Sequence, residues 1–68
     1  MESKLEIVVQ SNLSDALIET SIEGKEDIVR LRIEFAKFAI NKSRGNLNQY
    51  IDADKWFEEF NRKILTLV

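Results

Sequence analysis

The chain has 68 residues, of which 44% are hydrophobic and 32% charged, and its formal net charge is −2. These values are typical of one small soluble folded domain, and they exclude an intrinsically disordered chain and a chain of several domains. The sequence has no cysteine and no histidine, which excludes disulfide bonds, a thiol nucleophile and a histidine base, so we expect no enzymatic activity, no metal site and no cofactor.

Size also bears on the oligomeric state and on the location. A chain this short buries only about 60% of its unfolded surface, and small domains usually add disulfides, a metal or a partner chain. Only the partner chain is left here, so we expect a homodimer. No apolar run reaches the ~20 residues of a membrane span, and the start MESKLEIVV does not resemble a secretory signal. We therefore expect a cytoplasmic protein with no membrane contact.

The first expected element is a strand over Lys4–Gln10, KLEIVVQ. Leu5, Ile7 and Val9 point to one side of such a strand, and the content of β-branched residues favours it. Next we expect a helix over about residues 13–20.

That helix has Asn12 or Ser14 as its cap and Asp15 in its first turn. Gly24 is suited to end this part of the chain, either as a helix stop or in a turn.

The central segment Ile28–Ile40, IVRLRIEFAKFAI, fits two structures. Its length and helical spacing favour a helix over about residues 27–42, with an apolar arc wide enough to be buried on two sides, as between a core and a dimer partner. Its first eight residues alternate and also fit a strand, which would make the fold a β-α-β unit with a C-terminal helix. Arg32 falls among the apolar positions of the helix, so we expect it to pair with Glu26, Glu34 or a carboxylate across a dimer.

A last helix is expected after a turn that contains Gly45, with Asp52 or Asp54 as its cap. Its apolar positions share one face, namely Ala53, Trp56, Phe57, Phe60, Ile64 and Leu67. The apolar end, residues 64–68, should dock on the fold or join a dimer interface. The sequence thus predicts one mostly helical α+β domain over residues 1–68, with a short N-terminal strand followed by three helices.

Charge is distributed unevenly along the chain. Residues 1–27 hold two basic and seven acidic residues, a balance of −5, whereas residues 28–45 hold five basic and one acidic residue, a balance of +4. The second block can form a phosphate-binding patch. The candidate nucleic-acid contacts of this patch are Arg30, Lys37, Lys42 and Arg44. Alternatively, the two blocks neutralise each other within the fold.

Aromatic residues gather among acidic ones in residues 48–60, NQYIDADKWFEEF. Such residues often supply the energy of a protein interface, and the acidic ones suit a basic partner surface. The candidate partner-binding residues are Tyr50, Ile51, Trp56, Phe57 and Phe60. Alternatively, the last three of these pack on Phe35 and Phe38 and complete a small core.

The order KLEIVVQ, SNLSDALIETSIEG, KEDIVRLRIEFAKFAINK resembles that of ribbon-helix-helix regulators, in which strands of two chains form a ribbon that enters the major groove. The resemblance implies a dimer whose outward strand residues Lys4, Glu6 and Val8 face the bases. Residues 48–60 look like the part of a bacterial antitoxin that lies on its toxin.

On these grounds we expect a non-enzymatic interaction or regulatory module, either antitoxin-like or a transcriptional regulator. The alternatives are a small nucleic-acid-binding protein that uses the basic patch, and an accessory or inhibitor subunit that acts only through a protein partner.

Overall fold

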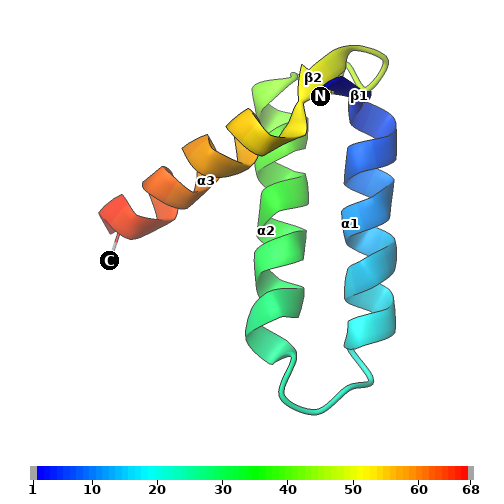
Figure 1. The fold of residues 1–68 in the computed structure, drawn as a ribbon, viewed down its shortest axis with the longest axis vertical. Coiled ribbons are helices and arrows are strands. Elements are labelled where there is room, and N and C mark those ends of the chain that lie inside the picture. The colour runs from blue at the N-terminus through cyan, green and yellow to red at the C-terminus, as the bar shows by residue number, and fades with distance from the viewer. Residues whose placement is uncertain (1, 68) are drawn as a thin grey trace.

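The computed structural model describes residues 2–67, and the side chains of residues 2–64. Its elements are β1 (Glu2–Lys4), α1 (Leu5–Glu19), α2 (Glu26–Lys42), β2 (Tyr50–Asp52) and α3 (Ala53–Leu67). Helices α1 and α2 form an antiparallel hairpin, and α3 starts near the end where the chain begins and projects away from it (Figure 1). The prediction of an α+β fold with a short N-terminal strand and three helices is confirmed.

The expected strand over Lys4–Gln10 is wrong, because helix α1 already begins at Leu5. The segment supports both periods, since its apolar residues alternate and also recur at helical spacing. The helix wins because Leu5, Val9 and Ala16 then lie on one face and are all buried. The ribbon that the regulator resemblance implies is therefore not formed by these residues, and of the three expected to face bases only Lys4 lies in a strand.

The start of α1 is capped by the chain that precedes β2. Neither Asn12 nor Ser14 caps this helix, and the residue before it makes no side-chain cap. Instead the backbone N–H groups of Leu5 and Glu6 donate to the carbonyl oxygens of Gln49 and Leu47, both at 2.9 Å. Two of the four N–H groups that a helix start leaves without partners are thus satisfied by the loop.

The strand β2 was not predicted from the sequence. It pairs with β1 in an antiparallel two-stranded sheet, in which Ser3 lies opposite Ile51. This short pairing holds the start of α3 beside the start of α1. The hairpin and the third helix are thereby joined at the end of the molecule opposite the turn between α1 and α2. Because no turn connects the two hairpin helices there, we call it the open end.

The helix predicted over residues 27–42 is confirmed as α2, which extends over Glu26–Lys42. The alternative β-α-β unit is wrong, because residues 28–35 are helical. Two acidic residues in the first turn and Lys42 in the last turn both complement the helix dipole.

Gly24 and Gly45 occupy the turns on either side of α2, as expected from the sequence. Their φ angles are +90° and +80°, in the left-handed region that glycine adopts without strain. The N–H of Gly45 donates to the carbonyl of Ile40 at 3.0 Å and so satisfies one of the carbonyls at the end of α2.

Replacing Gly24 with alanine is expected to lower the free energy of unfolding by about 1–2 kcal/mol. The position is open, with no atom within 4 Å of an added Cβ, so the cost comes from the backbone conformation alone. Urea unfolding followed by far-UV circular dichroism measures it. The variant Glu23→Ala, one residue away, serves as the control, and equal stability of the two variants would contradict the prediction.

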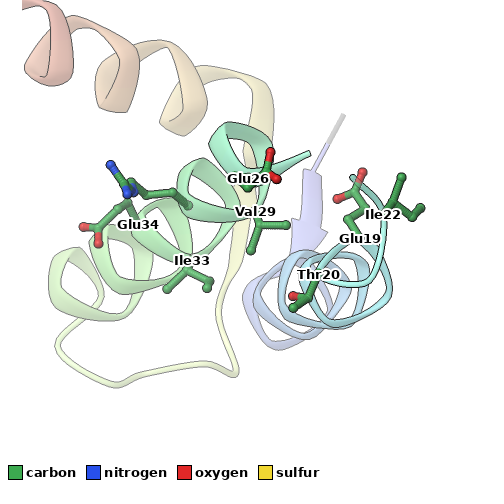
Figure 2. A pocket seen from close by; sticks show the side chains of 8 residues that line it. Glu19, Thr20, Ile22, Glu26, Val29, Ile33 and Glu34 are labelled. Carbon is green, nitrogen blue, oxygen red and sulfur yellow. The ribbon is translucent and has the colours of Figure 1, made fainter. Parts of the chain in front are cut away.

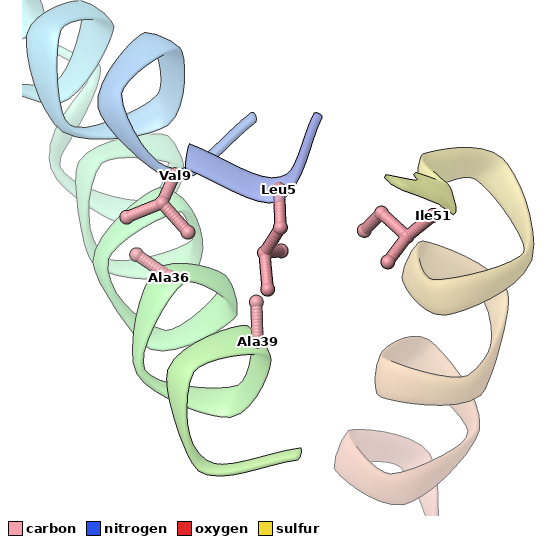
Figure 3. Packing of buried hydrophobic residues seen from close by; sticks show 5 residues of the cluster. All are labelled: Leu5, Val9, Ala36, Ala39 and Ile51. Carbon is pink, nitrogen blue, oxygen red and sulfur yellow. The ribbon is translucent and has the colours of Figure 1, made fainter. Parts of the chain in front are cut away.

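The core of the hairpin lies near the open end (Figure 3). It is a cluster of five buried residues from α1, α2 and β2, namely Leu5, Val9, Ala36, Ala39 and Ile51. The two alanines allow the helices to approach closely, so Leu5 fills the space between them and β2. Leu47 and Trp56 pack against the edge of this cluster.

Helix α3 begins at Ala53, directly after β2. The carboxylate of Asp52 accepts a hydrogen bond from the N–H of Lys55 at 3.3 Å, so Asp52 caps the helix. Of the two caps predicted from the sequence, Asp52 and Asp54, the first is therefore confirmed. The expected docking of the apolar end concerns residues 64–68. All of these side chains except Ile64, which is half-buried, lie outside the described part of the chain.

Candidate interaction site

The five predicted partner-binding residues all lie on β2 and the first half of α3, but the structure divides them. Ile51 and Phe60 are buried and belong to the core of the monomer. Trp56 is half-buried. Tyr50 is 65% exposed and Phe57 38% exposed, so these two rings are accessible to a partner.

Phe60 lies at the centre of a cluster of four phenylalanine rings that joins α3 to α2. Its ring centroid is 5.5 Å from those of Phe35 and Phe38, and 6.1 Å from that of Phe57. Phe57 also makes an edge-to-face contact with Phe35 at 5.3 Å. Such geometries are favourable for aromatic pairs. The alternative prediction, that aromatic residues of the last helix pack on Phe35 and Phe38, is confirmed for Phe57 and Phe60.

Lys42 provides a second link between α2 and α3. Its ammonium group donates to a carboxylate oxygen of Glu59 and lies 4.7 Å from the centroid of the Trp56 ring. The hydrogen bond from Lys42 holds the pKa of the Glu59 carboxyl below its ordinary value, and the positive charge of Lys42 acts in the same direction. This part of the site is therefore ionised at neutral pH.

The pairing of Glu59 predicts a dependence on acid. Because its pKa is lower in the folded state, the pairing adds stability above the pKa of about 4.3 that glutamate has in an unfolded chain, and this contribution is lost as the pH falls through the folded pKa. The replacement Lys42→Gln should raise the midpoint of Glu59 in an NMR titration of the carboxyl carbon. The replacement Lys55→Gln should leave it in place, and an unchanged midpoint in Lys42→Gln would contradict the assignment.

The α3 surface beside Phe57 carries exposed carboxylates, whereas Tyr50 lies opposite Lys4 of β1. Asp54 and Glu58 are exposed, one on each side of Phe57 along the helix. An exposed ring between carboxylates is suited to a partner surface that is apolar with basic residues around it.

The predicted nucleic-acid contacts are not gathered into one patch. Arg30 and Lys37 are seven residues apart and share one side of α2, but Glu34 also lies on this helix surface and pairs with Lys37 at 3.6 Å. Lys42 is engaged by Glu59, on the side of α2 that faces α3. Lys4 lies in β1 and Arg44 in the turn after α2, where its φ is +54°.

Arg32 joins the two helices of the hairpin. Its guanidinium donates to Glu19 at 2.5 Å and lies 3.7 Å from Asp15, so its partners are on α1 and not the expected Glu26 or Glu34. The hydrogen bond with Glu19 raises the pKa of Arg32 above its ordinary value. This pairing joins two acidic residues of the first block to one basic residue of the second.

A further apolar surface, which the sequence did not point to as a site, lies along the hairpin. We call it the hairpin face and define it by four large residues that are partly or mostly exposed: Leu13, Leu17, Ile33 and Ile40. Leu13 and Leu17 are one helical turn apart on α1, and Ile33 and Ile40 two turns apart on α2, so each pair shares one side of its helix.

The two halves of the hairpin face meet at a hollow near the turn between α1 and α2. This hollow has a volume of about 350 Å³, and Thr20, directly after α1, and Ile33 of α2 both line it (Figure 2). Thr20 lies three residues after Leu17 and therefore on the same side of α1. Both pairs of the hairpin face thus lie on the same side of the hairpin.

Helix α3 packs on a different side of α2. Phe35, which holds α3, lies two residues after Ile33 and so about 200° around the helix from it. No described element of the chain therefore covers the hairpin face. A signal for this face existed in the sequence: Val29, Ile33 and Ile40 recur at spacings of four and seven residues and so share one side of the helix.

Within the described residues there is no group of three or more acidic side chains placed to hold a metal ion. Across the same range, no helix combines the length and the apolar character needed to cross a bilayer. Comparisons of the chain with protein-family models, with curated proteins and with solved structures find no match.

Proposed function

We propose that this chain is a non-enzymatic interaction module, antitoxin-like or regulatory, that binds a partner protein through its C-terminal arm, residues 50–67. The observation that carries the proposal is the way α3 leaves the hairpin. The helix is held to α2 by the rings of Phe57 and Phe60, by the contacts of Lys42 with Glu59 and Trp56, and by Lys63 over the Phe38 ring, and its axis diverges from the hairpin (Figure 1). Exposed aromatic surface at Tyr50 and Phe57, near the root of a helix that diverges from the hairpin, suits docking on another polypeptide.

The chemistry of the arm indicates the kind of partner. Tyr50 and Phe57 supply exposed aromatic surface, and the exposed carboxylates of Asp54 and Glu58 favour a basic protein. A cytoplasmic setting fits a chain with no cysteine. The proposal follows the antitoxin resemblance in one respect only, the binding of the C-terminal segment to a partner protein. It does not require a strand over residues 4–10.

The test is affinity capture from lysate of the source cell, followed by calorimetry with the captured protein after purification. The wild-type chain is one bait, and a double variant with Tyr50→Ser and Glu58→Lys is the second. Both positions are exposed, so their replacement leaves the core intact. The matched control is Ile18→Gln, an equally exposed change on α1. We expect the double variant to bind at least about tenfold more weakly than the wild type and the control.

Equal binding of the wild-type chain and the double variant would contradict the proposal, and so would the absence of any specifically captured protein. Capture of nucleic acid in place of protein would favour the alternative of a basic patch.

A further inference from the structure

We propose that two copies of this chain associate through the hairpin face, antiparallel to each other about a two-fold axis, so that the two hairpins form a four-helix bundle. This inference concerns α1 and α2 and is independent of the partner proposed for the C-terminal arm.

The first support is the amount of apolar surface that one copy leaves in water. Leu17 is 77% exposed, and the three other residues of the hairpin face are between 37% and 43% exposed. Three of the eight buried hydrophobic residues in the described core are alanines, which bury little surface each. A chain with so small a core gains much of its stability from a second copy that covers these side chains.

The second support is the spacing of the exposed side chains. On α2, the half-buried Val29 and the exposed Ile33 and Ile40 lie on one side of the helix at spacings of four and seven residues, next to Ala36 of the hairpin core. On α1 and directly after it, Gln10, Leu13, Leu17 and Thr20 recur at spacings of three, four and three residues.

Each helix therefore has a second apolar seam, which on α2 borders the one used within the hairpin and on α1 consists of Leu13 and Leu17 between two polar residues. Two hairpins placed face to face bring four such seams together, as in a four-helix bundle.

The third support is the distribution of charge along the hairpin. The turn end, residues 19–27, holds four acidic residues and one basic residue, a balance of −3. At the open end, residues 37–46 hold three basic residues and no acidic one, and residues 2–6 and 47–55 at the same end lower the balance to +1.

A two-fold axis across the middle of the hairpin places the turn end of each copy beside the open end of the other. A parallel arrangement would place like charges together, so the antiparallel one is favoured. The same surface thus complements itself, which is why we assign a second copy to it and not an unrelated protein.

The first experiment is sedimentation equilibrium at chain concentrations of roughly 1–100 μM. These concentrations detect dissociation constants at the weak, micromolar end for interfaces of ordinary size. The test variant is Leu17→Gln, and the control is Ile18→Gln. The two residues are adjacent and similarly exposed, at 77% and 64%, but Ile18 lies about 100° further around the helix, away from the hairpin face.

We expect a wild-type dimer whose dissociation constant rises about 100-fold or more in Leu17→Gln, because two copies of the side chain are lost from each dimer. In Ile18→Gln it should change less than about threefold, as at a position outside the interface. Far-UV circular dichroism checks that both variants remain helical.

A wild-type chain that is monomeric throughout this range would overturn the proposal. Equal effects of the two variants would also overturn it, and so would a monomer whose hairpin face binds a different protein.

The second experiment tests the orientation. Because the chain has no cysteine of its own, single cysteines introduced at Glu23 and at Arg44 report contacts without interference. Under mild oxidation, a mixture of Glu23→Cys and Arg44→Cys chains should give mainly the mixed disulfide dimer. A predominance of like-with-like dimers would show a parallel arrangement and overturn the proposal.

Discussion

Replacing Leu5 with alanine is expected to lower the free energy of unfolding by about 3–5 kcal/mol, the upper part of the range for buried leucine. The side chain is 0% exposed and lies where α1, α2 and β2 meet, against the small residue Ala39 and against Ile51 (Figure 3). A small neighbour cannot move inward far enough to fill the cavity. Since a domain of this size has a total stability of only about 3–10 kcal/mol, a large fraction of the molecules should unfold.

The measurement is urea unfolding monitored by far-UV circular dichroism. The control is Ile7→Ala, two residues further along α1, where the side chain is 62% exposed and the loss should stay within about 0.5 kcal/mol. Similar losses in the two variants would mean that Leu5 does not occupy the core as described.

Replacing Phe60 with alanine should detach α3 from the hairpin while leaving α1 and α2 helical. The ring contacts three other phenylalanines, and its removal should cost about 3–5 kcal/mol of stability. Trp56, the single tryptophan of the sequence, lies on α3 beside Lys42 and reports the change directly. We expect its fluorescence emission to move to longer wavelength and the amides of α3 to exchange faster.

The matched variant is Phe57→Ala, the same change one turn earlier on the same helix. Its ring is 38% exposed and contacts Phe35 and Phe60, so the expected loss of stability is about half as large. An equal or larger effect of Phe57→Ala would show that the cluster is not centred on Phe60.

The second and third helices could be predicted from the sequence because their local signals agree with each other. In α2 the apolar residues keep a helical spacing over 17 residues, longer than strands usually extend, and Gly45 follows its end. In α3 a capping aspartate precedes one strongly apolar face. Where the length of a segment, its apolar spacing and its capping residue all indicate a helix, tertiary contacts do not change the secondary structure.

The first helix could not be predicted over its full length, because residues 5–9, LEIVV, satisfy two periods at once. The sequence alone does not contain the partner that decides between them. The helix is favoured because Leu5 and Val9 pack on Ala36 and Ala39, more than 25 residues later in the chain. The carbonyls that cap this helix also come from distant residues, Leu47 and Gln49.

The candidate site shows the same division. The sequence identified the aromatic residues of the arm, but their periodicity is the same whether a ring faces the core or a partner. Packing on Phe35 and Phe38 buried Phe60 and left Tyr50 and Phe57 accessible. Likewise the sequence predicted that Arg32 pairs with a carboxylate, but the alignment of the two hairpin helices selected Glu19.

The sequence by itself determined that these residues form a small α+β domain with three helices, because composition, helical period and glycine turns are local properties of the chain. The tertiary structure decided where α1 begins, which aromatic rings stay accessible and which apolar face of the hairpin remains open. These features depend on contacts between residues far apart in the chain, and local spacing is the same whether such a contact forms or not.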